Sequence, residues 1–119
     1  MGYTHLLAND PSIEVFAGAF RKIRRALGTT AFGINEITMP AGFEGFEHDE
    51  LETGHEEVYA VLGGSGTATV DGIEIALTVG DFLRVDADAT RMISSGAEGL
   101  HFLVIGGKPR PEYDGRGSL

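Results

Sequence analysis

The chain has 119 residues, a formal net charge of −9 and no cysteine. This length corresponds to one domain with a core of its own, and the lack of cysteine excludes disulfides and thiolate chemistry. The negative charge argues against binding to nucleic acid or to an anionic membrane surface, and no apolar stretch approaches the ~20 residues that span a bilayer. Residues 1–20 also lack the basic start and apolar run of a secretory signal. We therefore expect a cytoplasmic protein with neither nucleic acid nor membrane as a partner.

The first 42 residues predict a few short elements. Residues 13–16 favour an edge strand, and residues 20–27 fit either a short helix closed by Gly28 or a strand. The basic side chains between Arg21 and Arg25 are typical of a solvated face or a dimer contact. Residues 30–39 predict a strand that ends at Pro40 and Gly42.

From residue 58 onwards, short apolar runs alternate with turn signals. Strands are predicted at residues 58–62, 67–70, 73–77, 82–85, 91–94 and 100–105. Between them lie Gly63-Gly64, Asp71-Gly72, Gly80-Asp81, and turns at residues 86–90 and 96–99. Asp-Gly between β-branched residues is a strong hairpin signal, because a type I′ turn needs two positive φ angles. This spacing predicts an all-β sandwich or barrel, with a core at about residues 30–106, an N-terminal arm at 1–29 and a C-terminal tail at 107–119.

The stretch that follows Gly42 resembles the first sequence motif of the cupins. In that motif a glycine is followed after five residues by His-x-His, a short spacer, a glutamate and, after six more residues, a glycine. Here His48 follows Gly42 at that interval, Glu50 replaces the second histidine, and Glu57 precedes Gly64 by the expected spacing. The spacer is longer than usual at residues 51–54, where a loop can absorb the excess. The resemblance covers residues 30–106 and implies a cupin-type antiparallel β-barrel, also called a double-stranded β-helix or jelly roll.

The second cupin motif departs further from the family pattern. Gly80 fits, but Asp86 and Asp88 replace a proline and a glycine, and Ser95 replaces an asparagine. Arg91 stands where the family has its fourth metal ligand, a histidine. Because arginine stays protonated, it cannot bind a metal.

Strand alternation predicts which of these side chains share a pocket. Residues i and i+2 point to the same face, so His48 should lie beside Glu50, and His55 beside Glu57 and Tyr59. Two imidazoles and two carboxylates form a plausible shell for one divalent ion such as Fe, Mn, Ni or Zn. The presence of that ion stays open, since Arg91 can pair with Glu57 instead of a metal, bind an anion, or lie at the rim.

Two further side chains are assigned to the ligand pocket. Arg91 should face the barrel interior, because it occupies the position of an inward histidine in the family. His101 shares a face with Leu103 and Ile105 on the last apolar strand, which predicts a place in the core or on the pocket wall.

The resemblance leaves the function open between two classes. One is a metal-dependent enzyme of the dioxygenase, isomerase or decarboxylase type, acting on a small polar molecule, with His55 or Tyr59 as acid or base. The other is a non-catalytic, metal-free module or sensor that binds a small anion at Arg91. A metal-free, epimerase-like enzyme is a weaker hypothesis, because no His–Asp pair is visible in the sequence.

Open sheet edges predict a homodimer, with residues 13–20 covering an edge strand of the neighbouring copy.

Overall fold

The structure is a computed structural model that describes residues 2–15 and 19–110. The elements in chain order are a 3₁₀ turn η1 (Pro11–Ile13), β1 (Glu14–Val15), β2 (Phe20–Arg21), α1 (Ile23–Leu27), β3 (Gly33–Met39), β4 (Glu56–Val70), β5 (Ile73–Thr78), β6 (Phe82–Val85) and β7 (Arg91–Gly107). The strand pairings are antiparallel, which confirms the predicted all-β class. Within the described ranges, no helix is long and apolar enough to cross a membrane.

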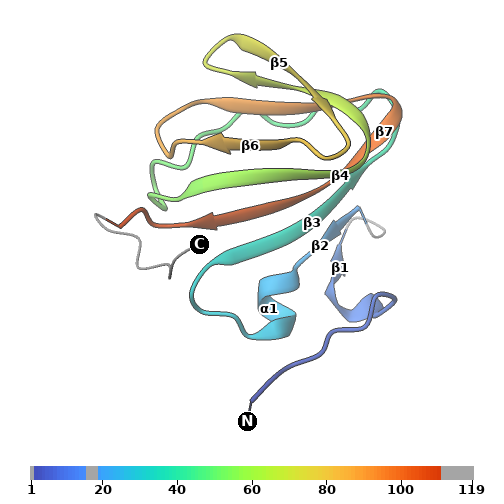
Figure 1. Cartoon of the computed structure of the whole chain (residues 1–119), viewed down its shortest axis with the longest axis vertical. Coiled ribbons are helices and arrows are strands. Elements are labelled where there is room, and N and C mark those ends of the chain that lie inside the picture. Colours follow the sequence, from blue (N-terminus) through green and yellow to red (C-terminus); the bar gives the residue numbers. More distant parts are fainter. Residues whose placement is uncertain (1, 16–18, 111–119) are drawn as a thin grey trace.

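Strands β4 and β7 run through both layers of the fold (Figure 1). Their pairing begins at Glu56 with Gly107 and ends at Val70 with Arg91. The first half of β4 also pairs with β6, and its second half pairs with β5. The sheet follows the order β1-β2-β3-β7-β4-β5, with β6 branching from β4. The result is a jelly roll whose sheet stays open at its ends instead of closing into a cylinder.

Glycines bend these two strands, although the sequence predicted that they would end them. The register of β4 shifts on both sides of Gly64, yet the strand continues to Val70, and β7 likewise continues through residues 96–99. Gly64 has a φ of 74°, and a Cβ on it would lie 2.1 Å from the carbonyl oxygen of Gly99. The missing side chain lets the two backbones touch at the corner between the layers. The strands predicted at 58–62 and 67–70 are therefore one strand, β4. Those predicted at 91–94 and 100–105 are likewise one strand, β7.

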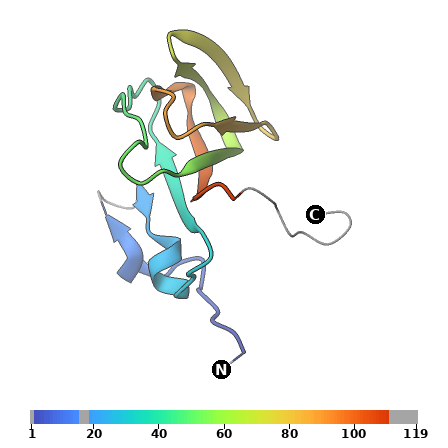
Figure 2. The ribbon, with the colours of Figure 1, turned by 90° about the vertical axis from the view of Figure 1, so that its left-hand side faces the viewer.

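The N-terminal elements project from one end of the barrel (Figure 2). Residues 23–27 form the helix that the sequence allowed, and Gly28 closes it with a left-handed φ of 74°. Phe20 and Arg21 belong instead to β2, which pairs with β3 of the same chain. The predicted strand at residues 13–16 is seen as β1, with Phe16 outside the described residues.

The core lies between the two layers. Its side chains are apolar residues that come from β4 to β7: Tyr59, Val61, Ala68, Leu77, Val85, Ile93, Leu100, Phe102 and Val104. The predicted hairpin is also present, since Asp71 and Gly72 have φ angles of 48° and 82°. Among the described residues, Arg91 is the one charged residue that is buried, and none of its surface is exposed.

A glycine-to-alanine pair tests the corner between the layers. A Cβ at position 66 would lie 2.3 Å from the carbonyl oxygen of Ser94, whereas one at position 33 would lie 3.6 Å from its nearest neighbour, the carbonyl oxygen of Gly106. We expect Gly66→Ala to lower the free energy of unfolding by about 1–3 kcal/mol, because β7 must move to make room. Gly33→Ala should change it by less than about 1 kcal/mol. Urea denaturation of both variants checks this, and equal midpoints would contradict the close approach.

Candidate metal centre

His48 and Glu50 are placed by a segment that runs along the start of β7. The backbone of His48 exchanges two hydrogen bonds with that of Arg91, at 2.9 and 2.8 Å, and the N–H of Glu50 donates to the carbonyl of Ala87 at 2.9 Å. These bonds point both side chains to the same end of the barrel. His48 Nε2 lies 3.4 Å from Glu50 Oε2, and their side chains are 45% and 19% exposed. The predicted pairing of these two residues is therefore present.

Glu57 reaches the same place from the second residue of β4. Its partners across the sheet are Gly106 on β7 and Val85 on β6. Because Gly106 has no side chain, the Glu57 stem packs over it; a Cβ there would lie 3.3 Å from Glu57 Cγ. Tyr59, two residues on, donates its hydroxyl to Glu57 Oε1 at 2.8 Å, so the predicted shared face of these two residues is also present.

The three side chains form one cluster of donor atoms. One ligand atom each from His48, Glu50 and Glu57 lies within 4.8 Å of the other two. Ligands at about 2.1 Å from a divalent ion lie about 3–4 Å from one another, so a small inward movement would bring all three into coordinating range. One imidazole and two carboxylates suit a divalent transition metal.

Each member of the cluster is also held by a second group. Thr53 donates its hydroxyl to Glu50 Oε1 at 2.9 Å, which leaves Oε2 toward His48. Tyr59 holds Oε1 of Glu57 in the same way. His48 Nδ1 faces the carbonyl of Phe46 at 3.5 Å, while its Nε2 faces Glu50. Such supporting bonds are typical of metal ligands.

Tyr59 stays protonated in this setting. Burial raises the pKa of its hydroxyl well above the usual value, and the nearby negative charge of Glu57 raises it further. The hydroxyl therefore acts as a hydrogen-bond donor at neutral pH and fixes the orientation of the Glu57 carboxylate.

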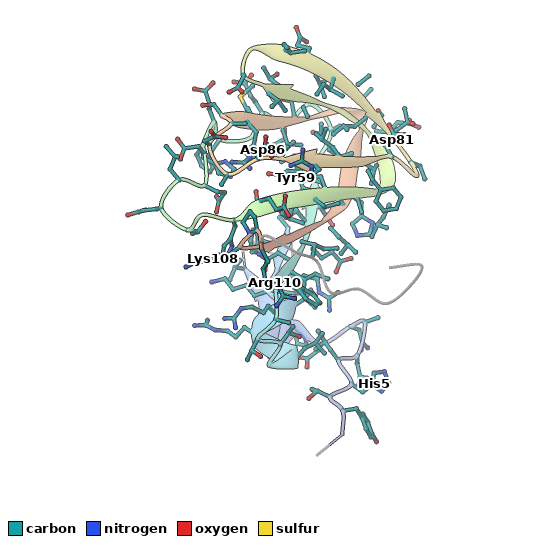
Figure 3. All side chains as sticks on the ribbon, turned by 60° about the vertical axis from the view of Figure 1, so that its left-hand side comes forward. His5, Tyr59, Asp81, Asp86, Lys108 and Arg110 are labelled. Carbon is teal, nitrogen blue, oxygen red and sulfur yellow. The ribbon has the colours of Figure 1, made fainter. Side chains whose placement is uncertain are left out.

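Arg91 lies inside the barrel, as its position in the second motif predicted. Its Nη2 is 3.8 Å from Glu57 Oε1 and donates to the carbonyl of Asp86 at 3.1 Å. Its Nε and Nη1 are buried and have no hydrogen-bond partner among the described residues. Figure 3 shows Tyr59 and Asp86 in the barrel body, far from His5 on the N-terminal arm.

The remaining predicted site residues lie apart from the cluster. His55 precedes β4 by one residue and is not a member of the group of three. His101 alternates with the buried Leu100 and Phe102 on β7, so it points to the outer face of the sheet instead of the predicted core or pocket wall.

On that outer face His101 belongs to a polar network that the sequence did not reveal. Its Nε2 lies 2.6 Å from Glu36 Oε2, and Arg21 Nη1 lies 2.7 Å from Glu36 Oε1. The three residues come from β7, β3 and β2, so only the pairing of distant strands brings them together. The network ties β2, and with it the N-terminal arm, to the barrel.

A surface hollow of about 420 Å³ lies between the N-terminal arm and α1, where Asp10, Lys22 and Arg25 are among its lining residues. None of the lining residues belongs to strands β3–β7 or to the metal cluster. The hollow is therefore a separate feature of the N-terminal arm.

Comparisons with known proteins agree with this architecture. No family model and no curated protein matches the sequence. A solved cupin protein from Bacteroides fragilis superimposes with a TM-score of 0.80 at 29% identity, covering 100% of this chain and 99% of that one. An RmlC-like cupin from Shewanella frigidimarina gives 0.71 at 22% identity over 93% and 97% of the two chains. A predicted oxalate decarboxylase from Thermotoga maritima gives 0.63 at 21% identity over 73% and 76%.

These structures, together with the jelly-roll topology, identify the fold of this chain as the cupin fold. The group at residues 48, 50 and 57 comprises three of the four residues that the sequence offered as metal ligands, and His55 is the fourth.

The Glu36 network predicts a pH-dependent contribution to stability. Partial burial raises the pKa of Glu36, but the hydrogen bonds from His101 and Arg21 outweigh it, so the pKa is lower than usual. The unfolded chain then binds more protons in the acid range, and this contribution is complete above about pH 5 and lost as the pH falls through the folded-state pKa. We expect Glu36→Gln to lower the free energy of unfolding by about 1–3 kcal/mol at pH 7, with the gap to wild type narrowing towards pH 3.

Chemical denaturation of both proteins between pH 3 and 7 measures this gap. Glu74→Gln, at an exposed position on β5, is the matched control and should stay within about 0.5 kcal/mol of wild type. If the difference in free energy of unfolding between wild type and Glu36→Gln were the same at pH 3.5 and pH 7, the lowered pKa of Glu36 would be contradicted.

Proposed function

We propose that this cupin binds one divalent transition-metal ion through His48, Glu50 and Glu57 and acts on a small polar molecule at that ion. The observation that carries the proposal is the convergence of three donor atoms within 4.8 Å, each side chain with a supporting partner. Two carboxylates this close together repel each other, and one guanidinium compensates only one of the two charges. A divalent ion removes this imbalance, so the charges of the cluster favour binding a cation.

The residues around the ion would each have a separate role. When bound, the ion supplies Lewis-acid polarisation of a substrate oxygen. His48, whose side chain is 45% exposed, marks the side from which a substrate enters. Tyr59 and Thr53 hold the two carboxylates in place. This division of roles suits an enzyme of the dioxygenase, isomerase or decarboxylase type, and the Thermotoga maritima neighbour carries the name of a predicted oxalate decarboxylase.

Removal of His48 tests the metal centre. His48→Ala deletes a ligand, and we expect it to weaken Mn²⁺ binding by at least about 10-fold. Glu47→Ala, at the exposed neighbouring residue, should bind Mn²⁺ as wild type does. Isothermal titration of chelator-treated protein measures both. Equal affinities in the two variants would show that the ion does not use His48.

A second candidate is a metal-free module that binds a small anion. It is favoured by Arg91, which is completely buried with two nitrogens that have no partner among the described residues. Elemental analysis of protein purified without chelator or added metal separates the two candidates. About one metal ion per chain supports the metal-dependent cupin, and a metal-free protein that binds small anions supports the module.

We also propose that two copies associate as a homodimer. Residues 1–28 carry four basic and two acidic side chains, whereas residues 29–110 carry four basic and fourteen acidic ones. The projecting arm of one copy is thus complementary in charge to the barrel of another. The outer face of the barrel adds exposed apolar side chains, Leu62 at 47% and Phe82 at 77%, which a second copy would cover.

Sedimentation equilibrium at micromolar concentration should give about twice the chain mass of 12.6 kDa. Reversing the exposed charges with Arg24→Glu and Arg25→Glu should shift the equilibrium towards monomer, as should high salt, because screening weakens exposed charge pairs. Lys108→Glu, a reversal outside the arm, is the control. A wild-type protein of 12.6 kDa throughout would refute the dimer.

A further inference from the structure

Arg91 places a fixed positive charge beside the proposed metal centre. We propose that the metal-loaded site takes a small carboxylate as its second ligand, and that Arg91 makes the binding of the ion and of the carboxylate depend on each other. This inference rests on the proposed metal site at His48, Glu50 and Glu57.

The charges in the barrel do not cancel when the ion is bound alone. Glu50 and Glu57 contribute two negative charges and Arg91 one positive charge, so the site carries −1 before an ion binds. A divalent ion with a neutral His48 changes this to +1. An uncompensated charge is costly on the inner side of the site, where the side chains of Arg91 and Glu57 are 0% and 15% exposed. A monoanion restores neutrality, so the ion and the anion each improve the site for the other.

The protein leaves the charge of Arg91 only partly compensated. Its contact with Glu57 is long, at 3.8 Å, and the nearer oxygen of Glu57 already accepts the Tyr59 hydroxyl. Among the described residues, the guanidinium donates one hydrogen bond, to the neutral carbonyl of Asp86. The Asp86 side chain itself pairs with Arg84 on the exposed side. No carboxylate among the described residues lies closer to Arg91 than Glu57 does.

The coordination positions of the ion favour the same kind of ligand. Three protein ligands leave positions open to a further ligand, and Arg91 cannot fill the position that the fourth histidine occupies in the motif. The side chain of His48 is nearly half exposed, so these positions face solvent. A carboxylate with a neighbouring oxygen, as in a 2-oxo or 2-hydroxy acid, would fill two of them and bring the single negative charge that the site needs.

The burial of Arg91 defines how the coupling works. Its side chain has no exposed surface, so the anion does not reach it as the structure stands. Arg91 acts through its charge over a few ångströms, where water does not screen it. Arg91 is therefore a positioning residue for the charge balance of the site, and its effect must appear in binding affinities.

The test measures the dissociation constant of Mn²⁺ for the full chain, with and without pyruvate, by isothermal titration corrected for Mn²⁺–pyruvate complexes. We expect saturating pyruvate to tighten Mn²⁺ binding by about 5–150-fold, the usual range of coupling between two ligands. By the same linkage, Mn²⁺ should tighten pyruvate binding by the same factor. Methyl pyruvate, the uncharged ester, should have less than about a twofold effect, and inorganic phosphate tests whether any oxyanion serves.

Variants at position 91 then assign the coupling to the guanidinium. Arg91→Met should bind Mn²⁺ alone more tightly than wild type does, because a like charge has been removed, and should lose most of the effect of pyruvate. Arg91→Lys keeps the charge and should keep the coupling. Arg84→Met, which removes an exposed arginine on β6, is the control and should resemble wild type. If Arg91→Met fails to fold, the wild-type measurements with pyruvate and its ester still decide the carboxylate proposal.

The outcomes separate this inference from the proposed function. Mn²⁺ binding that pyruvate changes by less than about twofold overturns the carboxylate proposal but leaves the metal site intact. Coupling that survives unchanged in Arg91→Met overturns the role of Arg91. If pyruvate binds equally tightly without Mn²⁺, the binding of the carboxylate does not depend on the ion, and the metal-free module is supported. No Mn²⁺ binding under any condition overturns the proposed function and this inference together.

Discussion

The long pairing between β4 and β7 is the interaction on which the rest of the structure depends. It runs from Glu56 with Gly107 to Val70 with Arg91 and passes through both layers of the jelly roll. β3, β5 and β6 each pair with one of these two strands. The pairing survives the corner between the layers because Gly64 and Gly66 bring β4 into contact with the backbone of β7. A side chain at either position would force the two halves of the barrel apart.

The same pairing places the chemistry of the site. Glu57 is the second residue of β4, and Arg91 is the first residue of β7. The antiparallel order brings the start of β4 beside the end of β7. The start of β7 pairs with the segment of His48. The cluster and Arg91 together thus combine residues from three separate stretches of chain. Its two carboxylates are fixed by hydroxyl groups from Thr53 and Tyr59, and the buried guanidinium of Arg91 offsets part of their charge. A site built this way attracts a cation before it attracts an anion.

Much of this arrangement could be predicted from the sequence, because strand alternation and motif spacing are local signals. They gave the hairpin at Asp71-Gly72, the shared face of Glu57 and Tyr59, and the inward position of Arg91. The continuity of β4 through Gly63-Gly64 could not be predicted, since a glycine pair signals a turn equally well, and only contact with β7 makes it a bend. The contact of His101 with Glu36 and Arg21 was missed for a similar reason: it depends on the register of three strands far apart in the sequence.

The most direct test of the account is anomalous X-ray diffraction from crystals of the chelator-treated protein soaked in Mn²⁺. We expect one strong anomalous peak per chain, bounded by the side chains of His48, Glu50 and Glu57, with Arg91 still buried behind Glu57. Peaks confined to other acidic surface residues, with the three side chains unchanged and no density between them, would contradict it.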